Sequence, residues 1–301
     1  MHTFSFLPCL LLSLLLLLVS TAHAIEIKVV SVTAEDGAKP IDPASIKLVP
    51  RPLSPSSIER VRNKTAGDEE DPGRTSRRSS GAGNAVSYSG NWCGAMQNAP
   101  ASNLVSSVSG WLTAPILDIR HTENRTPQFA ASWMGIDGGE NCRTALLQGG
   151  TTTEIDANGF QTSKAWFEWI PDAAFDIPNM PVAPGDNIYI KVEALSSRRG
   201  RITMTNADQP FSIVIELTDG QPLCRRHAEW IVENFRVNSN RVPFAKFDDI
   251  WFQECEVKLQ NGQTWGVDGS RMYYMETVYD VPVCRALEYD NGIFLAESDG
   301  N

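Results

Sequence analysis

The feature that most constrains this chain of 301 residues is a series of short alternating or apolar segments past Asn84. Gly, Pro, Asn and Asp interrupt them about every 8 to 12 residues, and no stretch has a helical period with caps. This spacing predicts an all-β domain, an antiparallel sandwich or barrel. The expected strands are Ala85–Ala95, Leu104–Leu112, Gln128–Gly135, Thr144–Gly149, Thr152–Ile155, Lys164–Ile170, Asn187–Leu195, Arg201–Asn206, Phe211–Leu217, Ala228–Phe235, Asp248–Lys258 and Met272–Val281.

Residues 1–24 have the features of a secretory signal peptide. An apolar run from Leu7 to Val19 is followed by Ala22-His23-Ala24, a small-x-small cleavage site. The run is shorter than the roughly 20 residues that span a bilayer. We therefore expect a secreted, extracellular protein without a membrane anchor.

Residues 25–78 are rich in Pro, Ser and charge, which is typical of a solvated or disordered segment. The segment is either a linker or a propeptide cut near Arg77-Arg78. Because it stands between a signal peptide and a globular remainder, we expect a largely flexible propeptide at 25–78 and a mature domain at 79–301.

Charge is distributed unevenly between these parts. Of the chain's 26 Lys+Arg and 36 Asp+Glu, the segment 25–78 holds 10 and 9, which leaves the mature region 16 basic and 27 acidic residues. An acidic surface of this kind argues against nucleic acid as a partner, because nucleic acids are bound through Lys and Arg clusters.

Five cysteines remain after the signal peptide: Cys93, Cys142, Cys224, Cys255 and Cys284. Secretion favours disulfides, and an odd number allows at most two bridges within one chain. The chain shows no Cys-x-x-Cys or His/Cys cluster with zinc spacing. We expect neither a metal site nor a cofactor.

The segment Ala228–Phe235 carries two carboxylates, Glu229 and Glu233, on one face of an expected strand. Acidic residues are seldom buried without a partner, so these line a cleft or face solvent. Four residues separate them by roughly 13 Å along a strand, too far for a glycosidase pair. A glycosidase would have to combine one of them with Glu168 or Asp137.

Other hydrolase arrangements find no support in the sequence. It lacks a Gly-x-Ser-x-Gly elbow and the Asp-Thr/Ser-Gly pair of aspartic proteases, and the mature region has only His121 and His227 to complete a triad. Glu168 adjoins Trp166 and Trp169, and burial beside aromatic rings would raise its pKa towards a range useful for proton transfer.

Five blocks of the mature region carry a recognisable set of residues. They are Ser89–Ala95, Ser132–Gly138, Ala145–Gly150, Ala165–Asp172 and Ala228–Phe235. In this order they resemble the blocks of the glutamic peptidases, or eqolisins, and the likeness continues through Val242–Ala245. The resemblance implies a sandwich of two packed antiparallel sheets (concanavalin/lectin-like jelly roll) and a secreted acid endopeptidase with a Gln/Glu dyad.

Carried over block by block, the resemblance implies that Gln148 and Glu233 form the dyad. Glu233 would act as general base and acid on a water, and Gln148 would orient the water and stabilise the oxyanion. Glu229 fills the family's other acidic position. The positions that line or support the family's cleft are Trp92, Trp133, Asp137 and Glu168.

Two positions depart from the family's pattern, since Thr152 replaces a common acid and Ile170 a common aromatic residue. The resemblance also implies a disulfide between Cys142 and Cys224, with Cys255–Cys284 as the second and Cys93 as a free thiol.

These observations lead to the hypothesis of a monomeric zymogen that cleaves proteins or peptides. Its propeptide would shield the cleft as an intramolecular inhibitor. The alternatives are a non-catalytic sandwich that binds carbohydrate or protein, and a glycosidase that uses Glu168 with another carboxylate.

Overall fold

The computed structural model describes residues 25–34, 40–51, 85–121, 125–139, 142–237, 240–276 and 282–297. The expected signal peptide and the cleavage site at Arg77-Arg78 lie outside these residues. The described residues are almost entirely β, with one 3-10 turn at Pro43–Ser45. None of them belongs to a helix long and apolar enough to cross a membrane.

The first sheet consists of antiparallel neighbours, and it carries all the predicted catalytic residues. Its strands run in the spatial order β9 (Gln161–Ile170), β8 (Leu146–Ile155), β7 (Gln128–Ile136), β14 (His227–Glu233), β4 (Trp92–Asn98) and β20 (Arg271–Glu276). At one end β10 (Phe175–Asp176) pairs with β9, and at the other β3 (Val86–Ser89) pairs in parallel with β20.

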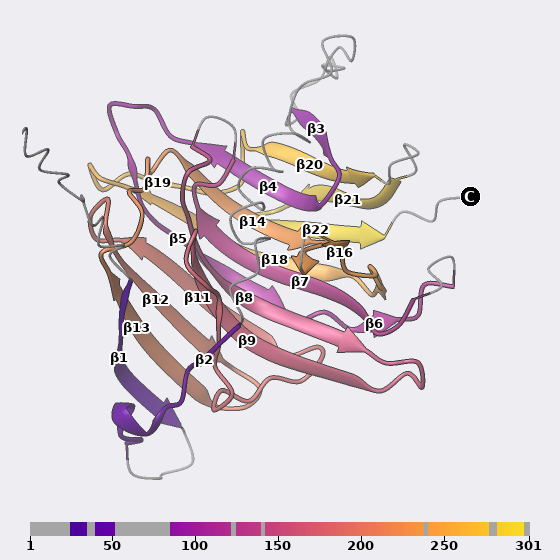
Figure 1. Ribbon diagram of the computed structural model, residues 1–301. Helices are drawn as coiled ribbons and strands as arrows, with labels where there is room; N and C mark the ends of the chain where they lie inside the picture. Colours follow the sequence, from indigo (N-terminus) through magenta and orange to yellow (C-terminus); the bar gives the residue numbers. More distant parts are fainter. Residues whose placement is uncertain are drawn as a thin grey trace, which may run out of the picture.

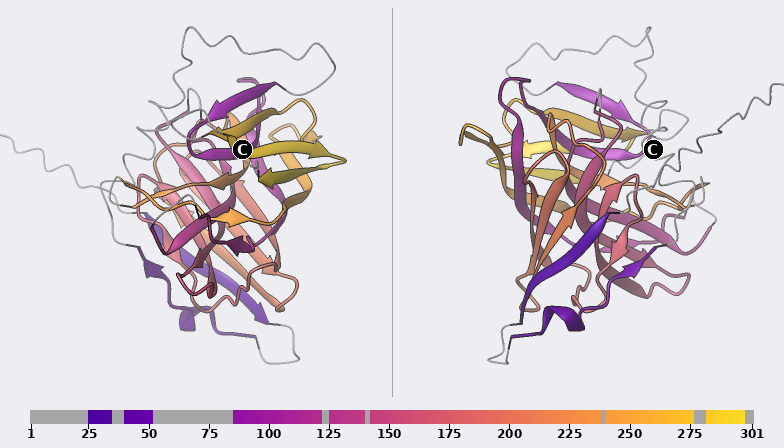
Figure 2. Two further views of the ribbon diagram at one scale, coloured as in Figure 1. Left: turned by 90° about the vertical axis from the view of Figure 1, so that its right-hand side faces the viewer. Right: turned by 60° about the vertical axis from the view of Figure 1, so that its left-hand side comes forward.

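The second sheet lies behind the first, and the two layers are visible in Figure 1 and Figure 2. A C-terminal hairpin, β21 (Pro282–Tyr289) and β22 (Gly292–Glu297), connects β20 to β18. The order then continues β18 (Ile250–Leu259), β5 (Val105–Thr113), β11 (Asn187–Ala194), β12 (Arg199–Asn206) and β13 (Phe211–Thr218). The predicted all-β sandwich of packed antiparallel sheets is confirmed.

Short strands complete the fold. Within the described residues they are β6 (Leu117–Asp118) with β17 (Lys246–Phe247), β15 (Arg236–Val237) with β16 (Asn240–Arg241), and β19 (Thr264–Trp265) with β18.

The expected strands Thr144–Gly149 and Thr152–Ile155 are one strand, β8. The chain does not turn at Gly150, because the backbone of Gly150 packs against Ser132 and Trp133.

Burial patterns show which sheet carries the site. Strand β13 alternates buried and half-buried residues, as expected of a sheet with one solvated face. Strand β14 is buried at all seven positions. Its Trp230 and Val232 join the core between the sheets, whereas Ile231 belongs to a separate cluster on the opposite face. The first sheet therefore buries side chains on both of its faces, one against the second sheet and the other in the cluster around Ile231.

Parts of the segment 25–78, for which the sequence predicts a largely flexible propeptide, form strands in the described ranges 25–34 and 40–51. Strand β1 (Glu26–Ala34) forms an antiparallel ladder with β13, and β2 (Val49–Pro50) pairs with β10. The segment thus supplies an outer strand to each sheet, as Figure 1 shows in indigo. The missed signal is the alternation of Ile27, Val29 and later apolar residues, which pack against the core.

The disulfide pattern confirms one predicted pair and corrects the other. Cys142 bonds to Cys224 as expected, but Cys93 bonds to Cys284, and Cys255 is a buried free thiol. The expected Cys255–Cys284 pair and a free Cys93 are therefore wrong. The reason is the unforeseen packing of β21 beside β4, which brings Cys284 to Cys93.

Candidate active site

Glu233 lies at the end of β14, where two donors hold its carboxylate. Trp133 Nε1 donates to Oε2 at 2.9 Å, and Asn91 Nδ2 donates to Oε1 at 3.3 Å. The side chain is 2% exposed. Both hydrogen bonds stabilise negative charge, and each carboxylate oxygen has a further lone pair with which to accept from water. Glu233 is thus a buried carboxylate held in a fixed orientation.

Gln148 lies on β8 directly opposite Glu168 of β9. Its Nε2 donates to Glu168 Oε2 at 2.6 Å. Because a carboxylate oxygen accepts this hydrogen bond, the amide group that faces Glu168 must be the donor, Nε2. This fixes the orientation of the amide and identifies its remaining atom as the oxygen Oε1. Gln148 Oε1 is buried and has no hydrogen-bond partner among the described residues. An unpaired buried acceptor is costly unless a ligand or water satisfies it.

The strand register places both candidate glutamates on the face that carries Gln148. Gln148 lies opposite Gly135, which lies opposite Glu229. Glu233 lies on the same face four residues further along β14, so Gln148 and Glu233 are placed diagonally across two strand spacings of the sheet. Gly135, between Gln148 and Glu229, has no side chain, and Trp133 Cζ3 and Leu146 Cδ1 lie 3.0 Å from the position that its Cβ would take.

Aromatic rings fill the surface between these groups. Trp92 and Trp133 meet edge to face with ring centroids 5.2 Å apart. Trp92, Trp133 and Trp166 belong to the same cluster as Ile231, the cluster on the outer face of the first sheet. The predicted Trp92, Trp133, Glu168, Glu229 and Gln148 therefore share one face with Glu233.

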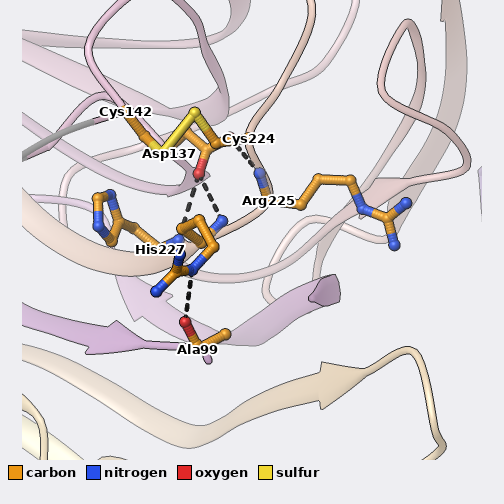
Figure 3. The surroundings of a disulfide bond; sticks show 7 residues. Ala99, Asp137, Cys142, Cys224, Arg225 and His227 are labelled. Atoms are coloured by element: carbon orange, nitrogen blue, oxygen red, sulfur yellow. Dashed lines mark hydrogen bonds between the residues drawn. A yellow bond between two sulfur atoms is a disulfide. The ribbon is translucent and has the colours of Figure 1, made fainter. Parts of the chain in front are cut away.

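Asp137 has a different position. It follows β7 and accepts from the backbone N–H groups of Arg225, Arg226 and His227 at 2.6, 2.8 and 3.2 Å. Figure 3 shows this arrangement beside the Cys142–Cys224 disulfide. Burial raises the pKa of Asp137, and these hydrogen bonds oppose the rise. Asp137 fixes the backbone of the segment that leads into β14, so its contribution to the site is indirect.

Asp137, Cys142 and His227 also form a cluster with the spacing of metal ligands, all within 4.8 Å of one another. Cys142 is bonded to Cys224 and has no thiolate to offer. Burial, followed by the charges of Arg226 and Arg143, lowers the pKa of His227 to about 4. The same two arginine charges would repel a cation, and the disulfide leaves only two of the three ligands, so this group does not fit a metal site.

Two contributors to the site were missed in the sequence. Asn91 belongs to the block Ser89–Ala95, and the sequence predicts no role for it, although its amide reaches Glu233. Gly150 lies in the gap between two expected strands, yet a Cβ there would lie 2.5 Å from the Cβ of Trp133. Its absence lets Trp133 pack closely. The separation of Trp133 and Gly150 along the sequence does not indicate this contact.

Comparisons with known proteins identify the family of the chain. A family model described as the Peptidase A4 family matches residues 90–291. Aspergillopepsin-2 of Aspergillus niger is 31% identical over 196 residues, which cover 60% of this chain and 67% of that protein. Scytalidopepsin B of Scytalidium lignicola is 35% identical over 150 residues, or 47% of this chain and 55% of that protein.

Solved structures show the same fold. Scytalido-glutamic peptidase bound to a transition-state analog inhibitor superposes with a TM-score of 0.61 at 26% identity, over 69% of this chain and 98% of that chain. Aspergilloglutamic peptidase from Aspergillus niger superposes with a TM-score of 0.53 at 29% identity, over 57% and 99%. With about two thirds of its length matched by the family model, the chain belongs to the Peptidase A4 family, the eqolisins.

Proposed function

We propose that this protein is a secreted endopeptidase that hydrolyses peptide bonds in acid with Gln148 and Glu233. The observation that carries the proposal is the pair of complementary groups on one face. Glu233 is held by Trp133 and Asn91, and Gln148 presents an unsatisfied buried acceptor. Two relatives with solved structures are named as glutamic peptidases, which supports the same reading.

In the proposed reaction, a water lies between the two side chains and the scissile carbonyl. Gln148 Oε1 accepts a hydrogen bond from the water, and the ionised Glu233 removes the water's other proton as the oxygen attacks the carbonyl carbon. The second N–H of the Gln148 amide donates to the developing oxyanion. Glu233 then returns its proton to the leaving amine, and the peptide C–N bond breaks.

The electrostatics suit an acidic medium. The Gln148 amide is uncharged at any working pH and keeps both functions. Glu168 binds one of its N–H groups, which positions the amide without itself contacting the reacting atoms. A carboxylate base remains partly ionised at a pH where histidine is fully protonated. All the groups needed come from the chain.

The N-terminal segment supports a further part of this proposal, a zymogen. Arg51 follows β2 and binds Asp176 at 2.7 Å, while its guanidinium lies 5.6 Å from the ring centroid of Trp166. A cavity of about 170 Å³ near this point is lined by Arg51, Thr152 and Lys164 among others. Thr152 shares a row with Glu233. We propose that this segment obstructs one end of the cleft until it is displaced.

The test is digestion of acid-denatured haemoglobin by protein cut at Arg78, compared with Gln148→Ala. Cleavage by the processed protein in acid and its loss in the folded variant are expected. A processed protein that leaves the substrate intact but binds it would favour the non-catalytic alternative. Release of reducing sugar that survives loss of Gln148 would favour a glycosidase based on Glu168.

A further inference from the structure

The hairpin that follows β14 directly brings a cation to the site. Strands β15 and β16 place Arg236 and Arg241 opposite each other. The hairpin is anchored because Phe235 and Val242, 8% and 7% exposed, both belong to the cluster on the catalytic face. Val242 N also donates to Phe235 O at 3.1 Å. The backbone that carries Arg241 is thus held in place by these contacts.

The guanidinium of Arg241 lies on the turn that also touches the catalytic carboxylate. A Cβ on Gly90 would lie 2.7 Å from Arg241 Nη2 and 3.4 Å from Nη1. The next residue, Asn91, donates to Glu233 Oε1. Arg241 and Glu233 therefore approach the same short turn.

The guanidinium of Arg241 lies in the field of Glu233 but forms no ion pair with it. No oxygen in the described part of the chain accepts a hydrogen bond or ion pair from its guanidinium. Burial, followed by the neighbouring Arg236, lowers the pKa of Arg241, and the charge of Glu233 raises it. Two arginines directly opposite in a ladder repel each other, so an anion bound beside them would relieve this repulsion.

We propose that Arg241 is a specificity-determining residue that binds a carboxylate of the peptide substrate close to the scissile bond. The proposal rests on the proposed peptidase function. A guanidinium offers a planar fork of N–H donors that matches a carboxylate, and it stays charged in acid. A peptide supplies this chemistry from an Asp or Glu side chain or from its C-terminal carboxyl group.

The test uses quenched fluorescent peptides in which Asp replaces each position around the cleaved bond in turn. Each Asp peptide is paired with an Asn peptide, and both are made with a free or an amidated C-terminus. At a pH of about 5, where the Asp side chain is mostly ionised, we expect one position, or the free C-terminus, to raise kcat/KM about tenfold. This is the size expected of a charged hydrogen-bonded contact.

Three variants assign the preference to Arg241. In Arg241→Met the ratio of kcat/KM for the favoured carboxylate peptide and its neutral partner should fall to about 1. Gly90→Ala, which displaces the guanidinium without removing its charge, should reduce the ratio. Arg199→Met, on β12 of the other sheet, should retain it. A ratio near 1 in the wild-type protein, or an unchanged ratio in Arg241→Met, would overturn the proposal.

Binding separates this inference from the peptidase assignment. Calorimetry with Gln148→Ala measures affinity without turnover, and we expect the favoured carboxylate peptide to bind about tenfold more tightly than its neutral partner. Adding Arg241→Met should remove the difference. If the wild-type protein cleaves nothing while this difference is present, the peptidase function fails and the carboxylate site stands. Equal affinities would refute the site.

Discussion

At the scale of single residues, Trp133 connects the aromatic cluster to the carboxylate that we propose as the base. Its indole Nε1 donates to Glu233 Oε2 at 2.9 Å. Trp133→Phe keeps a ring but removes this donor, so negative charge on Glu233 loses stabilisation. We expect kcat/KM to fall about tenfold, since a charged hydrogen bond contributes about 1.5 to 3 kcal/mol.

Trp230→Phe is the matched control, because Trp230 Nε1 donates to Ser109 O in the core between the sheets. It should lower the free energy of unfolding and leave kcat/KM of the folded protein unchanged. Equal kcat/KM values for Trp133→Phe and the wild-type protein would show that the Trp133 bond does not support catalysis.

His227 gives a prediction about stability. Its pKa is about 4 in the folded protein, mainly because of burial, against about 6.5 in an unfolded chain. Between these values only the unfolded state binds the proton, so the free energy of unfolding falls as the pH falls from 6.5 to 4. The loss contributed by His227 is on the order of 3 kcal/mol.

Replacing His227 by Gln should therefore flatten the decline of stability between pH 6.5 and 4, as measured by urea unfolding. The exposed His121→Gln serves as the control and should follow the wild-type curve. If the wild-type and His227→Gln curves run parallel over this range, His227 is not the group that titrates.

At the scale of elements, the N-terminal segment occupies the outer edge of both sheets. Exposed edges invite further strand pairing, and β1 and β2 cover β13 and β10. Arg51 fixes the end of this segment beside Trp166. In the uncut chain, Arg51→Met should loosen the end and raise the rate of peptide cleavage several-fold. Lys47→Met, which removes an exposed charge on the same segment, should not change it.

Equal cleavage rates in Arg51→Met and Lys47→Met would contradict a role for Arg51 in obstructing the cleft. The comparison must use chains that remain uncut, verified by mass, because processing at Arg78 alone would raise the rate.

At the scale of the whole molecule, much of the architecture was predictable. Polar and apolar alternation with turn residues identifies strands such as β11, β12 and β13, because each has one face in the core. The blocks around Gln148 and Glu233 indicated the residues that the first sheet brings to one face. These features depend on local patterns and on blocks that can be read along the chain.

Other features depend on contacts between distant segments, which no local pattern specifies. Cys93 and Cys284 are 191 residues apart, and the spacing of five cysteines could not choose between pairings. The outer position of β1 depends on the edge left open by β13. The hydrogen bond from Asn91 to Glu233 depends on a pairing between β4 and β14 that places position 92 opposite 233.

The central claim is that Glu233, and not Glu229, is the general base that acts with Gln148. Glu229 lies in the row of Gln148 and is completely buried, whereas Glu233 has the two orienting donors. The most direct measurement is the acid cleavage rate of one peptide by processed Glu229→Gln and Glu233→Gln, with folding verified by circular dichroism. We predict a loss of at least about 1000-fold in Glu233→Gln and substantial residual activity in Glu229→Gln. Near-normal turnover by folded Glu233→Gln would contradict the account.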